Sequence, residues 1–316
     1  MRALVAAVLL AGCAEAQVAS PQDAPAVPSS DAKLSVDATE VLSSVEEPED
    51  TVAVADARDI SPVLSCEGIA QQGGLVVCQT TPGAKVDVGR SETDIYTMTA
   101  DANGVLIVGF DRDEPDNFIR VGNERIDFDL TPREWDISRI DGLPKNMVSE
   151  YTEAELAHIR RSTARKKVGF ASRVDEIGFK DGFISPIPAG YTKTTNFGAQ
   201  RILNGEPKRP HFGVDFAAPE GTPIVAPADG IVSLADDDMY FEGSLIMIDH
   251  GQGLISYYLH NEDVLVEDGQ RVAQNEQIAT VGSRGRSTGP HLCWRLKWRG
   301  RNLDPELVMT DWPAEG

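Results

Sequence analysis

The stretch HFGVD at residues 211–215 is the most informative part of this chain, together with STGPHLC at residues 287–293. Alternate side chains of a β-strand share a face, so His211, Gly213 and Asp215 are expected to point one way, with Gly213 leaving the metal face clear, while Phe212 and Val214 enter the core. The same alternation places Cys293 on one face with the histidine two positions before it. Imidazole, carboxylate and thiolate are all zinc ligands, so the two strands together predict a zinc site.

A third pair of the same kind occurs at Tyr258 and His260, with apolar or aromatic neighbours expected behind them. The surrounding residues 183–308 are rich in short apolar runs punctuated by glycine, which indicates β-strands. One such signal is HGQG at residues 250–253, between two apolar runs, which predicts a hairpin with His250 as a structural residue at its turn.

These residues resemble the lysostaphin/LytM-type zinc endopeptidases, which cut the peptides of the bacterial cell wall. The resemblance rests on His211-x-Gly-x-Asp215, on Tyr258-x-His260 and on residues 287–293, framed by TNFG at 195–198 and the stretch 221–230. It implies an antiparallel β catalytic domain, a Zn²⁺ cofactor and peptidoglycan as substrate. The residues that it implies for the site are the metal ligands His211, Asp215 and Cys293, the catalytic histidines His260 and His291, and Tyr258 as a transition-state donor.

Cys293 departs from the pattern of this family, which has a histidine as the last metal ligand. Thiolate is an ordinary zinc ligand, but its negative charge lowers the formal charge of the centre from about +1 to about 0. A less positive centre acidifies bound water less. The sequence therefore predicts tight metal binding with slower hydrolysis, and it leaves open a catalytically weak or inactive module that binds or activates a cell-wall amidase.

The N-terminal end predicts export. Met1 and Arg2 precede a short apolar run that is too short to span a bilayer, which is typical of a signal peptide. The run ends in LAGC at residues 10–13, which resembles the lipobox of bacterial lipoproteins and implies cleavage before a lipidated Cys13. Ordinary cleavage after AEA at residues 14–16 is the alternative. Because residue 14 is alanine and not aspartate, the resemblance implies, in a Gram-negative cell, the outer membrane, facing the periplasm.

The cysteines that remain are interpreted for an oxidising compartment. Cys66 and Cys78 lie symmetrically about a turn at residues 71–74, so a hairpin would place them opposite each other and allow a disulfide. Cys293 is then left without a cysteine partner, which suits a buried or metal-bound thiol.

Three further segments are expected besides the signal peptide at 1–13 and the catalytic domain at 183–308. Residues 14–60 are acidic, contain no aromatic residue and predict a disordered linker. Short strand-like runs over 61–142 predict a small β-sandwich. Residues 149–175 predict a linking helix, with a capping box at 152–155 and a basic cluster at 165–167 suited to its C-terminal end. His158 on this helix is interpreted as a surface residue.

The formal net charge of −21 excludes a general nucleic-acid-binding surface, which would have to be basic. It also disfavours spontaneous docking on anionic lipid, so we expect membrane association only through a covalent anchor. The expected partners are peptidoglycan and, in the alternative interpretation, an amidase.

Overall fold

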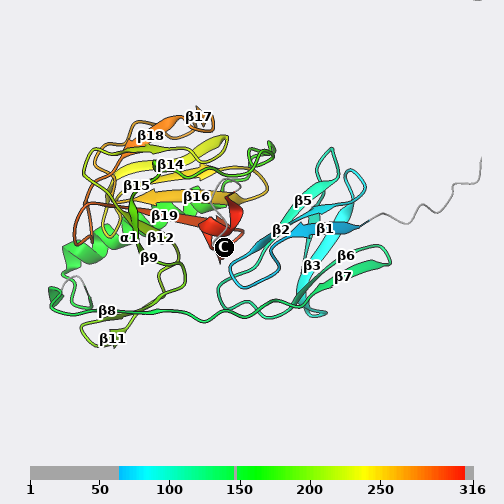
Figure 1. The fold of residues 1–316 in the computed structure, drawn as a ribbon, viewed down its shortest axis with the longest axis horizontal. Helices are drawn as coiled ribbons and strands as arrows, with labels where there is room; N and C mark the ends of the chain where they lie inside the picture. The colour runs from blue at the N-terminus through cyan, green and yellow to red at the C-terminus, as the bar shows by residue number, and fades with distance from the viewer. Residues whose placement is uncertain (1–63, 146–147, 310–316) are drawn as a thin grey trace, which may run out of the picture. The chain divides into compact units, whose positions relative to one another are not determined.

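The computed structural model describes residues 64–145 and 148–309, and Figure 1 shows its helix and strands. The predicted mainly β fold is confirmed, since one long helix accompanies many short strands. The predicted signal peptide, the lipidation site Cys13 and the linker at 14–60 lie outside the described residues. Across the part of the chain that the structure describes, no helix is long and apolar enough to cross a membrane.

Two small antiparallel sheets come first in the described chain (Figure 1). One has the order β1-β2-β5 and the other the order β4-β3-β6-β7. Their strands are β1 (Ser65–Gly68), β2 (Leu75–Gln79), β3 (Lys85–Ser91), β4 (Asp94–Thr99), β5 (Val105–Gly109), β6 (Asn117–Val121) and β7 (Glu124–Phe128). In β3, Val86 and Val88 are buried while Asp87 between them is half-buried. This alternation is what a sheet with a single core face requires.

The first hairpin carries a disulfide. β1 and β2 are antiparallel, and their register places Cys66 opposite Cys78. The two sulfur atoms are bonded. Gly73 and Gly74 lie in the intervening turn, where Gly73 has a φ of 80° that favours glycine.

The last strand of the segment expected to form the sandwich pairs elsewhere. β8 (Ile137–Ile140) lies parallel to β10 (Gln200–Leu203), which also pairs with β11 (Glu206–Pro207). Backbone hydrogen bonds from Gln200 N to the Asp136 carbonyl and from Asn204 N to the Ile140 carbonyl flank this pairing. The two sandwich sheets therefore end at β7, earlier than the expected limit at residue 142.

Helix α1 (Glu153–Ala171) begins with the predicted capping box at Thr152. The Glu155 amide donates to Thr152 Oγ1 at 3.2 Å, and the Thr152 amide donates to the Glu155 carboxylate at 2.7 Å. The helix has no basic residue in its last turn, because it continues to Ala171 beyond the basic cluster. Lys166 in that cluster instead pairs with Glu242 at 2.5 Å.

The largest sheet has the order β17-β14-β15-β16-β19-β12-β9, with β20 paired to β19. A separate two-stranded sheet joins β13 and β18. The bounds are β9 (Thr192–Thr195), β12 (Val214–Ala217), β13 (Pro223–Val225), β14 (Gly230–Met239), β15 (Gly243–Asp249), β16 (Leu254–Leu259), β17 (Arg271–Val272), β18 (Gln277–Thr280), β19 (His291–Trp298), β20 (Arg301–Leu303) and the 3₁₀-helix η2 (Pro305–Val308). The two faces of the largest sheet pack against different hydrophobic clusters, one containing Trp294 and the other containing Cys293.

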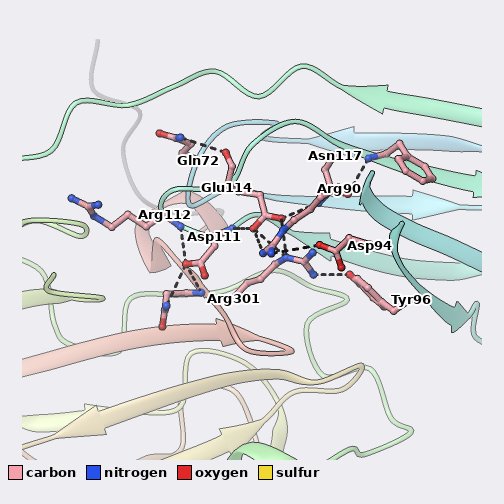
Figure 2. Close-up of polar contacts among 11 residues, drawn as sticks. Gln72, Arg90, Asp94, Tyr96, Asp111, Arg112, Glu114, Asn117 and Arg301 are labelled. Atoms are coloured by element: carbon pink, nitrogen blue, oxygen red, sulfur yellow. Dashed lines mark hydrogen bonds and ion pairs between the residues drawn. The ribbon is translucent and has the colours of Figure 1, made fainter. Parts of the chain in front are cut away.

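A buried carboxylate connects the sandwich strands to β20, as Figure 2 shows. The Glu114 side chain is fully buried and lies 2.6 Å from Arg90 Nε and 3.2 Å from Arg301 Nε. Arg301 also donates to the Tyr96 hydroxyl at 2.8 Å. A carboxylate removed from water in this way is stabilised only while its cationic partners remain, so these contacts hold the two parts of the described chain together.

Candidate metal centre

Three buried donor side chains converge where β12 lies beside β19. Asp215 in β12 pairs with Cys293 in β19 in the antiparallel register. His211 precedes β12 by a few residues. One donor atom from each of the three lies within 4.8 Å of the other two. The structure therefore brings together the three predicted metal ligands.

The distances within this group match the edges of a zinc coordination sphere. His211 Nε2 lies 3.1 Å from Asp215 Oδ1 and 3.4 Å from Cys293 Sγ. Tetrahedral bonds of about 2.0 Å to nitrogen and oxygen and about 2.3 Å to sulfur give edges of about 3.3 Å and about 3.5 Å. Asp215 Oδ1 is buried and accepts no hydrogen bond from the described residues. A buried acceptor left in this state fits a bound cation.

The protonation states of the three donors are set mainly by burial. Burial lowers the pKa of His211 to about 4, because a charged imidazole would lose its hydration. Burial opposes ionisation of Asp215, but the neighbouring His211 outweighs it, and the pKa of this carboxyl falls below its usual value. Burial raises the pKa of the Cys293 thiol to about 12. At neutral pH a metal ion would therefore have to displace the thiol proton in order to bind.

Two further histidines lie beside the donors. The ring centroids of His260 and His291 are 5.0 Å apart. His260 Nδ1 lies 2.7 Å from the Arg284 carbonyl oxygen, and His291 Nδ1 lies 2.8 Å from the Gly289 carbonyl oxygen. A carbonyl oxygen only accepts, so Nδ1 carries the hydrogen in each ring, and Nε2 of the neutral ring is left as an acceptor. Burial lowers the pKa of His260 to about 3, which keeps that ring neutral.

A pocket of about 340 Å³ lies beside these groups. Asp215, His260 and His291 all line it, together with Arg201, Arg286 and Ser287. A ligand in this pocket can therefore meet the carboxylate and both imidazoles at once. This is the arrangement that proton transfer beside a metal ion requires.

Tyr258 is not brought to the site. In the register between β16 and β19 it pairs with Trp294, whereas Leu259 pairs with Cys293. Residues that pair across neighbouring strands share a face, so Tyr258 and Cys293 point to opposite faces. Tyr258 is fully buried in the core. The expected shared face with His260 does not hold, because His260 lies beyond the end of β16 with a φ of 65°, where strand alternation no longer applies.

The two remaining histidines of the sequence have structural contacts. The His250 ring is buried, with Nδ1 2.7 Å from the Asp229 carbonyl oxygen and Nε2 2.7 Å from Ser256 Oγ. His158 Nε2 lies 2.7 Å from the Asp238 carbonyl oxygen. Neither histidine belongs to the group of donors, which agrees with the structural and surface roles expected for them.

Three arginines that lie near the donors were not identified in the sequence analysis. Arg295 lies two residues after Cys293 on β19, and its Nε donates a hydrogen bond of 3.3 Å to Sγ. Arg201 and Arg286 line the same pocket as Asp215. Strand alternation would have revealed Arg295, since residues two apart share a face. Arg201 reaches the site through the placement of β10, for which the sequence offers no signal.

Gly213 has a different role from the one expected, which was to leave the metal face clear. A Cβ at this position would lie 2.4 Å from Arg295 Cγ and 2.6 Å from the Trp294 carbonyl oxygen. Real atoms do not approach so closely, so the missing side chain makes room for β19 and for Arg295.

Comparison with known proteins supports the resemblance seen in the motifs. Residues 209–305 match the family model described as Peptidase family M23. Peptidoglycan DD-endopeptidase ShyA of Vibrio cholerae is 39% identical over 121 residues, which are 38% of this chain and 28% of that protein. Peptidoglycan DD-endopeptidase ShyB of the same species is 31% identical over 211 residues, which are 62% of this chain and 49% of that protein.

A crystal structure from Pseudomonas aeruginosa, classed as peptidase M23, has a similar fold. The TM-score is 0.55 at 24% sequence identity, and the match covers 75% of this chain and 94% of that chain. The likeness in fold thus extends beyond residues 209–305. The matched segments span less than half of the length of the two Vibrio cholerae relatives.

Proposed function

We propose, from the premise that residues 209–305 are an M23 peptidase domain, that this protein is a zinc endopeptidase that hydrolyses peptide cross-links of peptidoglycan. One observation carries the proposal: three donors lie at zinc-like spacings, and one of them, Asp215, lines a pocket that two histidines also line. The names of the two Vibrio cholerae relatives support the choice of substrate.

His211, Asp215 and Cys293 would hold the zinc ion. When bound, the ion supplies a Lewis acid beside the scissile carbonyl. Nε2 of either His260 or His291 takes a proton from the attacking water, because both rings are fixed through Nδ1 and leave Nε2 as the acceptor. The other imidazole, after taking up a proton from solvent, donates to the oxygen on which negative charge develops; because burial keeps His260 neutral, this donor is His291 and the base is His260.

Sacculi covalently labelled with dye test this proposal. The full chain is expected to release soluble dye, and a chelator such as 1,10-phenanthroline should stop the release. His291→Ala should abolish it as well, whereas His158→Ala, which alters a histidine outside the pocket, should leave it intact. Elemental analysis supplies a second readout, with an expected ratio of about one zinc ion per chain. Chelator-insensitive release, or purified protein that binds no zinc, would refute the proposal.

A catalytically weak module that activates an amidase is the second candidate. Two observations favour it: a thiol occupies the last ligand position, and Tyr258 lies in the core. The same sacculus assay separates the two candidates. Release only after a purified amidase is added, and unaffected by His291→Ala, would support the activator.

Export with lipid attachment at Cys13 is part of the proposal. The disulfide between Cys66 and Cys78 supports an oxidising compartment such as the periplasm. Mass spectrometry of the N-terminal peptide tests the anchor, because a lipidated Cys13 has a characteristic added mass. A mature chain that begins after Ala16 would instead support ordinary cleavage.

A further inference from the structure

A second, strongly basic groove adjoins the candidate metal centre. It has a volume of about 580 Å³ and lies between α1 and β19. We call it the cationic groove and define it by Lys166, Lys167, Lys208, Arg209, Arg295 and Lys297. It continues into the catalytic pocket, because Arg201, His260 and Arg286 line both.

The charge of this groove is opposite to that of the whole chain. Eight lysines and arginines line it, but only one acidic residue, Glu242. The chain as a whole carries a formal net charge of −21. Glu242 is already paired with Lys166. A basic lining concentrated beside the site of an acidic protein indicates selection for a negatively charged ligand.

Of the six residues that define the groove, Lys166 is paired with Glu242 and Lys208 with Glu206, whereas the other four form no ion pair with the described residues. Lys167 and Arg209 are exposed and form no ion pair with the described residues. Lys297 Nζ lies over the Phe170 ring at 4.8 Å. Burial lowers the pKa of Lys297; Asp111 opposes this effect, while the nearby Arg295, Arg209 and Lys166 add to it. Like charges held together in this way repel one another, and an anion placed among them relieves the repulsion.

We propose that the cationic groove is a substrate subsite that binds the free carboxylates flanking the scissile bond of an anionic peptide. The inference rests on the proposed function, since it assigns this groove to the substrate of the same site. In a diaminopimelate-containing cross-link, free carboxylates lie within a few bonds of the cleaved amide. A peptide extending from the catalytic pocket past His260 would place such carboxylates among the cations.

The affinity of this subsite can be measured without hydrolysis, by binding of a synthetic cross-linked peptide. Two probes are compared, one with free carboxylates and one with the same carboxylates amidated. Both are titrated by calorimetry into the full chain carrying His291→Ala, at two salt concentrations. The free acid is expected to bind about 10-fold more tightly than the amide at low salt, and the advantage should shrink at high salt.

Two double variants, each lacking two positive charges, test whether the carboxylates bind in the cationic groove. Lys167→Gln with Arg209→Gln removes two exposed groove cations, and Arg160→Gln with Lys180→Gln removes two cations that do not line it. The groove pair is expected to weaken binding of the free acid about 5-fold and to leave the amide unchanged, while the control pair changes neither. Circular dichroism and thermal melting establish that both variants fold.

The results for the two probes and the two double variants decide whether the groove is a carboxylate subsite. Equal affinities for the two probes would overturn the subsite, and so would equal losses in the groove and control variants. Failure of the wild-type chain to cleave sacculi would instead count against the proposed endopeptidase. That result leaves the binding comparison intact, because the binding is measured in the His291→Ala background.

Discussion

Substitution of Arg295 by methionine tests the electrostatics of the candidate metal centre most directly. Arg295 Nε donates a 3.3 Å hydrogen bond to Cys293 Sγ. A metal ion binds the thiolate form of cysteine, and the guanidinium beside the sulfur stabilises that form. Methionine retains much of the volume packed over Gly213 but removes both the donor and the charge.

The expected loss follows from the strength of such a contact. A hydrogen bond to a charged group contributes about 1.5–3 kcal/mol. We take about 1.5–2 kcal/mol, because Arg295 is partly exposed, and this corresponds to a metal affinity about 10- to 30-fold weaker. The pH at which half of the sites hold metal should rise, since a thiol with a higher pKa competes more strongly for its proton.

Competition with a chromophoric chelator measures the zinc affinity, and cobalt substitution reports the sulfur–metal bond through its charge-transfer absorption. Arg295→Lys, which keeps the charge, should recover part of the loss. Arg209→Gln removes a groove cation that does not contact the sulfur and should leave metal affinity unchanged. An Arg295→Met protein with wild-type zinc affinity, or an equal loss in Arg209→Gln, would refute the reasoning.

Three further predictions concern stability and activity. Glu114→Ala should cost about 3 kcal/mol at pH 7, because it removes the carboxylate that pairs with the buried Arg301, and urea denaturation measures this. Burial opposes ionisation of Glu114, but its arginine partners outweigh it and lower its pKa below 4.5. Its contribution is therefore fully present above about pH 4.5 and decreases as the pH falls towards its lowered pKa, so a difference in stability that did not shrink at all as the pH was lowered below 4.5 would contradict this. Replacing Cys66 and Cys78 together by serine should cost about 3 kcal/mol, from a loop closed at a separation of 12 residues, whereas an unchanged urea midpoint would show that the disulfide contributes nothing. Cys293→His should raise sacculus hydrolysis severalfold if a more positive centre acidifies water better, and slower hydrolysis by a variant that still binds zinc would count against that reasoning.

Much of the site could be predicted from the sequence, because the decisive side chains are close in sequence or follow strand alternation. Cys293 and its neighbours lie within β19, so the period of two places them correctly. The hairpin with Cys66 and Cys78 was equally local, since both cysteines flank one short turn.

The errors arose where backbone geometry or long-range packing decides the outcome. His260 lies beyond the end of β16 in a positive-φ conformation, so a period of two could not relate it to Tyr258. β8 pairs with β10 some sixty residues later, and parallel pairing over such a distance leaves no local pattern. The cationic groove joins α1, β10 and β19, so its charge becomes visible only in the fold.

The three arginines change what the cysteine implies for catalysis. Counting the ligands alone, a thiolate in place of an imidazole lowers the charge of the centre by one. Arg295 donates to that sulfur, and Arg201 and Arg286 line the pocket beside Asp215, so fixed positive charge lies both at the sulfur and in the pocket. A hydrogen bond to a thiolate withdraws electron density from the sulfur and makes it a weaker donor to the metal. The potential felt by a substrate carbonyl in the pocket is therefore set by ligands and arginines together. The decrease in hydrolysis rate that the ligand count alone predicts is therefore the largest decrease that Cys293 can cause. The increase in rate on Cys293→His should accordingly be larger in an Arg295→Met background than in the wild type.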